Sequence, residues 1–284
     1  MRFESEILGL PSGTESLLRQ LIHDRTGMVF DSGKVDIMMD KLAPLVVKRG
    51  FNSFLDYYYL LKYDENAPEE WRNVMNALSV GETYFWREMD QVRALTQTIV
   101  PHWFATHPGK TMRIWSAACA TGEEPLTIAM ALQEAGWFDR ASIEIHASDG
   151  SSGAIEKAAQ GVYRERSFRS LSPERRHRYF CPDSSTTWRI RPELHSRVRY
   201  SIANLMNEAD FAGMAAADVI FCRNVFIYFS EVAITKTVRS FARLMSSPGY
   251  LFVGVSESLM RLTRDFALEE VDDAFVYLKE SHGS

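Results

Sequence analysis

The chain has 284 residues, of which 46% are hydrophobic and 24% are charged, and its formal net charge at pH 7 is −5. This length and composition are typical of a soluble globular protein with one large or two modest domains. The slightly acidic balance gives no overall attraction to nucleic acid or to an anionic membrane. The first residues lack the apolar core of a signal peptide, and no run approaches about 18 apolar residues. We therefore expect a cytoplasmic protein with no membrane insertion and no nucleic-acid partner.

The cysteines and histidines predict neither disulfides nor a metal site. Cys119, Cys181 and Cys222 are odd in number and far apart. That pattern argues against a disulfide framework. The histidines show no spacing typical of zinc ligands, so we expect no bound metal.

Residues 1–80 read as a small all-helical domain. Apolar periodicity predicts helices within 14–27, 32–50, 52–64 and 67–80, which begin near Thr, Ser, Asn or Pro and in several cases end at Gly. Lys34, Lys41 and Lys48 recur every seven residues, which would place them on one helix face. Pro44 is expected to kink or break this helix. An ordinary solvated face is the alternative interpretation of the lysines.

Residues 81–284 alternate between strands and helices, which predicts a doubly wound α/β sheet. The predicted strands lie within 113–118, 142–149, 197–205, 218–226, 250–257 and 274–280, and the helices within 124–136, 152–160 and 230–245. Between about 161 and 201 the pattern changes to Arg, aromatic and turn residues. We interpret this stretch as a β-rich insertion in which TTWRIR and RVRY form exposed strands. A loop with solvated arginines is the alternative.

The stretch from Arg113 to Met130 predicts a strand, a turn of small residues and a helix, with a ligand at the turn. Glu123 and Glu124 occupy the helix start, where they would repel a polyphosphate. The implied ligand is nucleoside-like and positively charged, which favours S-adenosylmethionine over NAD or ATP. The absence of GxGxxG also disfavours a nicotinamide enzyme. A buried strand and a well-capped helix without a ligand is the alternative.

Two further polar positions follow predicted strands. Asp149 ends the second strand, where an acidic residue typically binds ribose hydroxyls, although it could instead be a helix N-cap. Cys222, Arg223 and Asn224 follow an apolar run at the edge of the sheet where ligands bind. A turn with a solvent-facing arginine is the alternative there.

These residues resemble a known family. GETYFWRE (81–88), RIWSAACATGEEPLTIAM, ASDGSSGAIEKAAQGVYRERSFRSL, Asn204-Leu205, DVIFCRNVFIYFS and GYLFVGVSESL are similar, in order and spacing, to the CheR chemotaxis-receptor methyltransferases. The resemblance runs from about Leu17 to Lys279. It implies a helical N-terminal domain, an S-adenosylmethionine-binding methyltransferase domain over 81–284 and a three-stranded β-subdomain at the insertion. It also implies methyl transfer to receptor glutamates, which gives a glutamyl methyl ester and S-adenosylhomocysteine.

The resemblance also implies the site residues. The cofactor site would be lined by Thr83, Arg87, Glu124, Asp149, Asn204, Leu205, Cys222 and Arg223. Arg87 and Tyr228 would face the reacting glutamate, although Tyr228 could instead be an aromatic packing residue. The chain departs from the family at Gly81, where Asn is usual, and at Gly150, where an aliphatic residue is usual.

The expected partners are the cytoplasmic helices of methyl-accepting chemotaxis receptors. The β-rich insertion, with Arg164, Arg166, Arg169, Arg189 and Arg191, is expected to contact the receptor, for example a tail peptide, rather than the cofactor. Two alternatives remain at this point. The same chemistry could serve a non-motility chemosensory array, or the protein could be a catalytically silent S-adenosylmethionine-binding adaptor.

Overall fold

The computed structural model describes residues 8–280. Its N-terminal part is a bundle of four helices, α2 (Thr14–Thr26), α3 (Val35–Lys48), α4 (Phe54–Tyr63) and α5 (Ala67–Leu78). Gly27 ends α2 in the left-handed conformation, and Ser53 caps α4 by accepting a hydrogen bond from Leu55 N. The bundle encloses its own apolar core, which includes Leu18, Met38 and Phe54. The predicted all-helical N-terminal part is confirmed.

The expected break at Pro44 is wrong, because α3 continues through this residue to Lys48. Pro44 lies on the exposed side of the helix, where water can reach the backbone that loses a helical hydrogen bond, while Leu42 and Val46 remain in the core. Only Lys41 and Lys48 of the three lysines lie within this helix, so their alignment is partial. Lys34 precedes the helix, and Lys41 Nζ donates to Leu78 O at 3.2 Å, so this lysine joins α3 to the end of α5.

The rest of the described chain is built on a seven-stranded sheet with the order β6-β2-β1-β7-β8-β10-β9. The strands are β1 (Met112–Ala117), β2 (Ile143–Asp149), β6 (Val198–Ile202), β7 (Val219–Phe221), β8 (Gly249–Phe252), β9 (Ala267–Val271) and β10 (Ala274–Lys279). The first five of them in the order run parallel, and β10 is antiparallel to both neighbours. The predicted doubly wound sheet is confirmed, and β9 was missed by the strand predictions.

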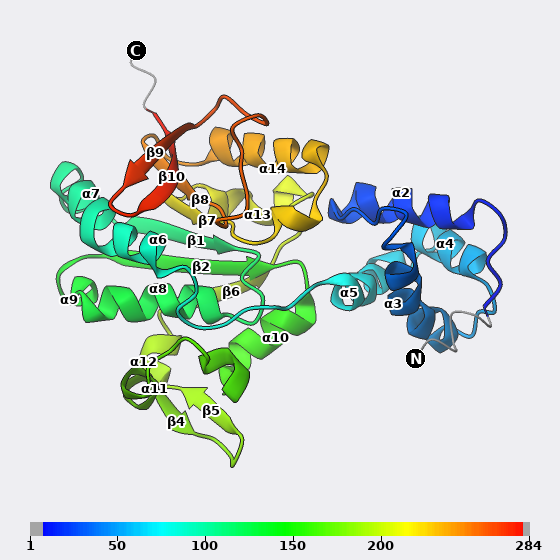
Figure 1. The fold of residues 1–284 in the computed structure, drawn as a ribbon, viewed down its shortest axis with the longest axis horizontal. Coiled ribbons are helices and arrows are strands. Elements are labelled where there is room, and N and C mark those ends of the chain that lie inside the picture. Colours follow the sequence, from blue (N-terminus) through cyan, green and yellow to red (C-terminus); the bar gives the residue numbers. More distant parts are fainter. Residues whose placement is uncertain (1–7, 281–284) are drawn as a thin grey trace.

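Helices cover both faces of this sheet (Figure 1). The face with α8 (Glu123–Glu134), α9 (Trp137–Arg140) and α10 (Ser152–Gln160) also carries α6 (Met89–Ala94), the π-helix η1 (Leu95–Ile99) and α7 (Val100–Thr106). The other face carries α13 (Glu208–Ala215) and α14 (Glu231–Leu244). Alternate residues of β1 enter the two cores: Ile114 packs on the first face, and Trp115 packs on the second. The helices within 89–106 and α13 were not among the predicted ones.

A three-stranded antiparallel sheet follows α10, with the order β3-β5-β4. It comprises β3 (Val162–Arg164), β4 (Phe180–Pro182) and β5 (Thr187–Ile190), with η2 (Glu165–Phe168), α11 (Pro173–Tyr179) and α12 (Pro192–His195) around it. This β-subdomain confirms the β-rich interpretation over the solvated loop. RVRY was assigned both to this insertion and to the predicted strand over 197–205, and the second assignment is confirmed, because Val198–Ile202 pairs in parallel with β2 and so belongs to the large sheet.

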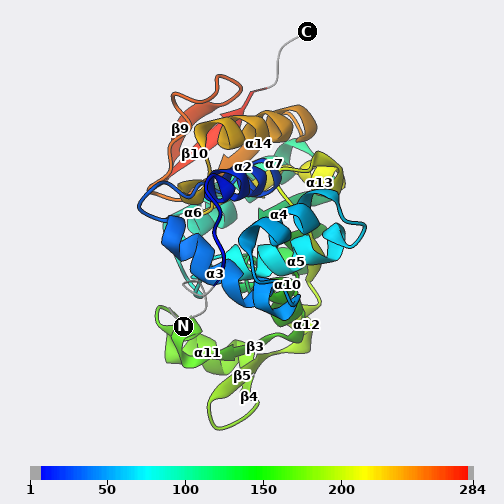
Figure 2. The ribbon, with the colours of Figure 1, turned by 90° about the vertical axis from the view of Figure 1, so that its right-hand side faces the viewer.

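The helical bundle lies beyond the carboxyl ends of the parallel strands, on the right in Figure 1 and toward the viewer in Figure 2. Val29 N donates to Tyr228 O at 2.8 Å, and Asn204 Nδ2 donates to Arg25 O at 2.7 Å. At a third place, Gly153 N donates to Asn76 Oδ1 at 3.0 Å. These contacts place the bundle over the site described next.

Candidate functional site

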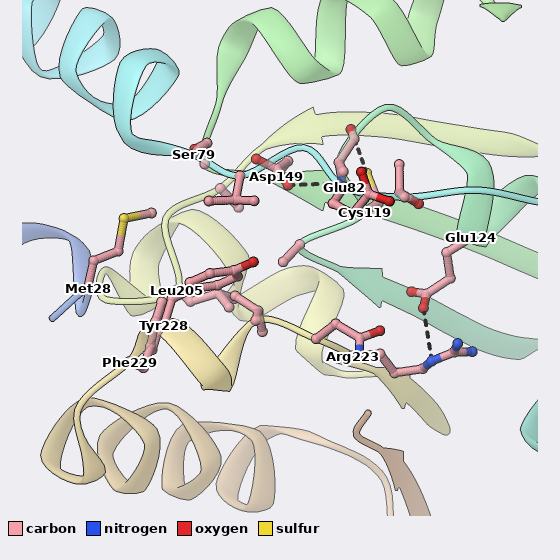
Figure 3. Close-up of a pocket in the computed structure, with 18 of the residues that line it drawn as sticks. Met28, Ser79, Glu82, Cys119, Glu124, Asp149, Leu205, Arg223, Tyr228 and Phe229 are labelled. Atoms are coloured by element: carbon pink, nitrogen blue, oxygen red, sulfur yellow. Dashed lines mark hydrogen bonds and ion pairs between the residues drawn. The ribbon is translucent and has the colours of Figure 1, made fainter. Parts of the chain in front are cut away.

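A pocket lies where β1, β2 and β7 end, between the sheet and the helical bundle (Figure 3). This is the edge at which open parallel sheets bind their ligands. Charged side chains, including Glu124 and Arg223, lie at one end. At the other end lie apolar side chains, including Met28, Leu205 and Phe229, and Asp149 lies on the β2 side.

The turn from β1 to α8 brings backbone, rather than side chains, to the pocket wall. Ala118 and Ala120 have positive φ angles of 58° and 48°, and both line the pocket. Gly122 follows with φ 93°, and a Cβ added there would lie 3.0 Å from the Cβ of Ala158. The small residues noted in the sequence thus allow a ligand to approach the main chain closely.

Asp149 ends β2 and is held by the two neighbouring turns. Its Oδ2 accepts a hydrogen bond from Ala120 N at 2.9 Å, and its Oδ1 accepts one from Ser151 N at 2.8 Å. Each oxygen retains a further lone pair for a ligand hydroxyl. Burial raises the pKa of this carboxyl group. The N-cap alternative is wrong, because Ser151 caps α10 by accepting from Ala154 N.

Arg223 is buried between two carboxylates at the charged end of the pocket. Its side chain is 2% exposed and lies 3.3 Å from Glu88 and 3.4 Å from Glu124. Glu124 Oε1 also accepts from Ser116 Oγ at 2.7 Å. Burial raises the pKa of Glu124, and the charge of Arg223 opposes that rise. The solvent-facing alternative for Arg223 is therefore wrong.

Only one of the two glutamates at the start of α8 faces the pocket. Glu123 is buried on the other side, where it accepts hydrogen bonds from Thr121 Oγ1 at 2.6 Å and Ser167 Oγ at 2.9 Å. Burial raises the pKa of its carboxyl group. The predicted repulsion of polyphosphate by two glutamates must be corrected to repulsion by Glu124 alone.

Arg87 is presented by a segment that is anchored on the β-subdomain. Phe85 is fully buried against Tyr163, Phe168 and Phe180, and its N donates to Ser167 O at 2.9 Å. Arg87, in contrast, lines the pocket, where its Nη1 donates to Glu82 O at 3.3 Å.

Tyr228 lies on a loop that is held by a carboxylate from the loop after β8. Glu257 accepts hydrogen bonds from the backbone N–H groups of Asn224 at 2.9 Å, Ile227 at 3.2 Å and Gly254 at 2.6 Å. Asn224 has a positive φ of 59°, so this carboxylate stabilises a strained turn. Tyr228 is half-buried and lines the pocket beside Phe229.

The structure brings most of the predicted site residues together. Those that line the pocket are Thr83, Arg87, Glu124, Asp149, Asn204, Leu205, Arg223 and Tyr228. Cys222 does not, because its side chain is fully buried in the core that packs against α14. The side chain of Asn204 is already engaged: its Nδ2 donates to Arg25 O, and its Oδ1 accepts from Met206 N.

Sequence reasoning missed the contribution of the helical bundle. Pocket residues from this part of the chain are Thr26, Met28, Met75, Ser79 and Val80. Thr26 and Met75 lie in helices and the other three lie just outside them, and no local signal in the sequence distinguishes such residues from ones that face only their own bundle.

Comparison with known proteins agrees with this geometry. The family model "CheR methyltransferase, SAM binding domain" matches residues 81–275, and "CheR methyltransferase, all-alpha domain" matches residues 16–79. The fold and the site are thus those of an S-adenosylmethionine-dependent methyltransferase.

Individual curated relatives indicate which kind of methyltransferase this chain is similar to. Chemotaxis protein methyltransferase 2 of Vibrio cholerae is 33% identical over 93% of this chain and 92% of its own length. The chemotaxis protein methyltransferases of Klebsiella aerogenes and Salmonella typhimurium are 35% and 34% identical, each over 88% of this chain and 85% of the relative. The chain belongs to the CheR family.

The residues present fit S-adenosylmethionine. Arg223 Nε makes no hydrogen bond among the described residues, but it lies 3.4 Å from Glu124 Oε2, so this guanidinium offsets the negative charge of Glu124 at the charged end of the pocket. Glu124 and Glu82 supply negative charge suited to a sulfonium and an amino group.

No cluster of metal-ligating side chains occurs among residues 8–280. Every helix in the same range also falls short of the length and apolarity that a membrane span requires.

Proposed function

We propose that this protein transfers a methyl group from S-adenosylmethionine to glutamate side chains of chemotaxis receptors. The observation that carries the proposal is the convergence of Asp149, Glu124 and Arg87 on one pocket in a chain of the CheR family. The substrate class comes from the relatives' function in chemotaxis. We also propose that the reaction takes place in the cytoplasm and that the chain divides into domains near residue 80.

The two ends of the pocket suit the two ends of the methyl donor. We assign Asp149 to the ribose hydroxyls, because an ionised carboxylate held by two backbone N–H groups is a strong, oriented acceptor. We assign Glu124 and Arg223 to the amino-acid end, which carries both a positive and a negative group. Thr83, Asn204 and Leu205 complete the proposed binding site, and Cys222 supports it from beneath.

The reaction requires correct positioning of the substrate carboxylate more than its activation as a nucleophile. S-adenosylmethionine supplies a methyl group bound to a positively charged sulfur. When a carboxylate oxygen bonds to the methyl carbon, the sulfur leaves with the electron pair of the broken carbon–sulfur bond. A glutamate carboxylate is already nucleophilic at neutral pH, so no strong general base is needed. Arg87 would orient the incoming carboxylate, and Tyr228 would donate a hydrogen bond beside it. The half-buried pocket would limit competing water.

We further propose that the β-subdomain binds the receptor rather than the methyl donor. Its strands β3 and β4 are both edges, and Pro182 blocks part of β4, so β3 is the better edge for an added peptide strand. Two of the five arginines already serve this subdomain internally: Arg189 pairs with Asp183 at 2.7 Å, and Arg191 donates to Arg178 O at 2.8 Å. Arg164 lies exposed on β3 and is the better residue to test.

Arg164→Glu is expected to weaken receptor binding, more strongly at low salt, while S-adenosylhomocysteine affinity stays unchanged. Arg189→Glu is a poorer reporter because it also disrupts an internal ion pair. Unchanged receptor binding at low salt, measured by co-sedimentation with receptor-containing membranes, would refute the assignment of Arg164.

The experiment for the main proposal is a transfer assay with radiolabelled S-adenosylmethionine and membranes that carry chemotaxis receptors. The expected product releases methanol in mild alkali, as a glutamyl methyl ester does. Labelling should disappear when the accepting glutamates are changed to alanine. Tight S-adenosylmethionine binding without any transfer would instead support a silent adaptor.

A further inference from the structure

The pocket is lined beside Asp149 by a side chain from the helical bundle. Met75, near the end of α5, lines the pocket together with Gly150, which directly follows Asp149. A Cβ added at Gly150 would lie 2.5 Å from Met75 Cε, and the next nearest atom, Ala203 O, would lie 3.8 Å away. Met75 therefore occupies the space that a side chain at position 150 would take.

Neighbouring contacts hold Met75 in this place. Asn76 accepts hydrogen bonds from Ser151 Oγ at 2.8 Å and from Gly153 N at 3.0 Å, and its Nδ2 donates to Ser152 Oγ at 3.1 Å. The end of α5 is thus bound to the first turn of α10. Because Met75 precedes Asn76, its position relative to Asp149 is set by these bonds and not by apolar contact alone.

The polarity of the pocket orients the methyl donor. Its charged amino-acid end matches Glu124 and Arg223, which lie at one end, and Asp149 lies on the β2 side. The flat, weakly polar adenine then falls on the far side of Asp149 from the charged groups, toward Leu205 and Phe229, and Met75 lines the pocket beside Gly150, next to Asp149. A thioether is polarizable and makes favourable contacts with aromatic rings.

We propose that Met75 of the helical bundle forms the apolar wall against the adenine of S-adenosylmethionine, in place of the side chain that Gly150 lacks. This inference rests on the proposed function only for the identity of the ligand. It makes α5 part of the binding site, so docking of the bundle and binding of the ligand stabilise each other.

The test compares binding of S-adenosylhomocysteine and of adenosine by calorimetry. Met75→Ala is expected to weaken both ligands about fivefold or more and by similar factors, because the contact is to the shared nucleoside. The double variant Met75→Ala with Gly150→Ile is expected to recover most of the loss, since isoleucine can fill the same space from the other side. Met260→Ala, an exposed methionine outside the pocket, is the matched control.

Several results would overturn the inference: unchanged affinity in Met75→Ala, loss for S-adenosylhomocysteine but not for adenosine, or no recovery in the double variant. Met75→Gln keeps the chain length and should also weaken binding, so a folding defect in Met75→Ala would not block the test. These binding results are independent of methyl transfer. Absence of transfer with intact binding would count against the proposed function and leave the role of Met75 unaffected.

Discussion

At the scale of single residues, the site depends on a few charged groups placed where water has little access. Asp149 and Glu124 are both desolvated, and each is compensated differently: Asp149 by two backbone N–H groups, and Glu124 by Ser116 and Arg223. A ligand that carries hydroxyls and positive charge adds the partners that these carboxylates still lack. The first three predictions follow from this arrangement.

Asp149→Ala is expected to weaken S-adenosylmethionine binding by about 1.5–3 kcal/mol, because a charged acceptor is lost. Calorimetry on the folded variant measures this directly. Glu156→Ala on the neighbouring α10, outside the pocket, is the control. An affinity equal to that of the unmodified protein would remove Asp149 from the binding site.

Arg87→Ala is expected to lower the rate of methyl transfer roughly 10- to 100-fold, because a misplaced substrate carboxylate reacts slowly. The melting temperature should change little, since Phe85 and not Arg87 anchors the segment. Circular dichroism and the transfer assay together test both statements. A variant that unfolds, or that transfers at the original rate, would make Arg87 a structural residue or an irrelevant one.

The affinity for S-adenosylmethionine is expected to rise as the pH is raised from about 5 toward neutrality. Burial raises the pKa of the Asp149 and Glu124 carboxyl groups, and the ligand prefers their ionised forms. The stability of the unliganded protein changes with pH in the opposite direction to the ligand affinity. Because the folded pKa exceeds the unfolded one, the unliganded protein loses free energy of unfolding as pH rises through this interval.

Calorimetry in buffers of different ionisation enthalpy should therefore show proton release upon binding near pH 5. Asp149→Asn, which cannot titrate, should release fewer protons. A flat affinity profile over this interval would mean that both carboxyl groups are already ionised in the free protein.

At the scale of elements, the conformation of the loop from β7 to α14 depends on contacts from outside the loop. It carries Arg223 and Tyr228, includes the strained Asn224, and is held from outside by Glu257 and by Val29 of the α2–α3 connection. A Cβ at Gly254 would lie 2.5 Å from Asn224 Nδ2, so the two loops also approach too closely for a side chain there.

Glu257→Ala is expected to lower methyl transfer at least tenfold and the free energy of unfolding by about 1–3 kcal/mol, because three backbone N–H groups, two of them part-buried, lose their acceptor. Glu270→Ala on the exposed strand β9 is the matched control. Val238→Ala, a core change in α14, shows what destabilisation alone does to the rate. If the two destabilised variants lose rate equally, Glu257 does not position the loop.

At the scale of the whole molecule, the pocket joins two parts of the chain that each have a core of their own. The parts meet through hydrogen bonds such as His23 Nε2 to Ser230 Oγ at 2.8 Å and Asn204 to Arg25. A ligand between them adds contacts to both, so binding should stabilise the bundle as well as the sheet.

S-adenosylhomocysteine at about 100 times its dissociation constant is expected to raise the free energy of unfolding by about 2.7 kcal/mol. Hydrogen exchange should slow at the end of α5 as well as around Asp149. Protection confined to residues after 81 would show that the bundle does not take part in binding.

The sequence by itself determined the helical N-terminal part, the alternating α/β order and the residues at the strand ends, because apolar periodicity and turn chemistry act over a few neighbouring positions. It did not determine that α3 passes through Pro44 or that Glu123 turns away from the pocket, since each depends on packing partners distant in the chain. Nor did it predict that Met75 reaches Gly150. Only the tertiary structure decides which helix faces the end of a strand, because that choice depends on contacts between segments and not on local preference.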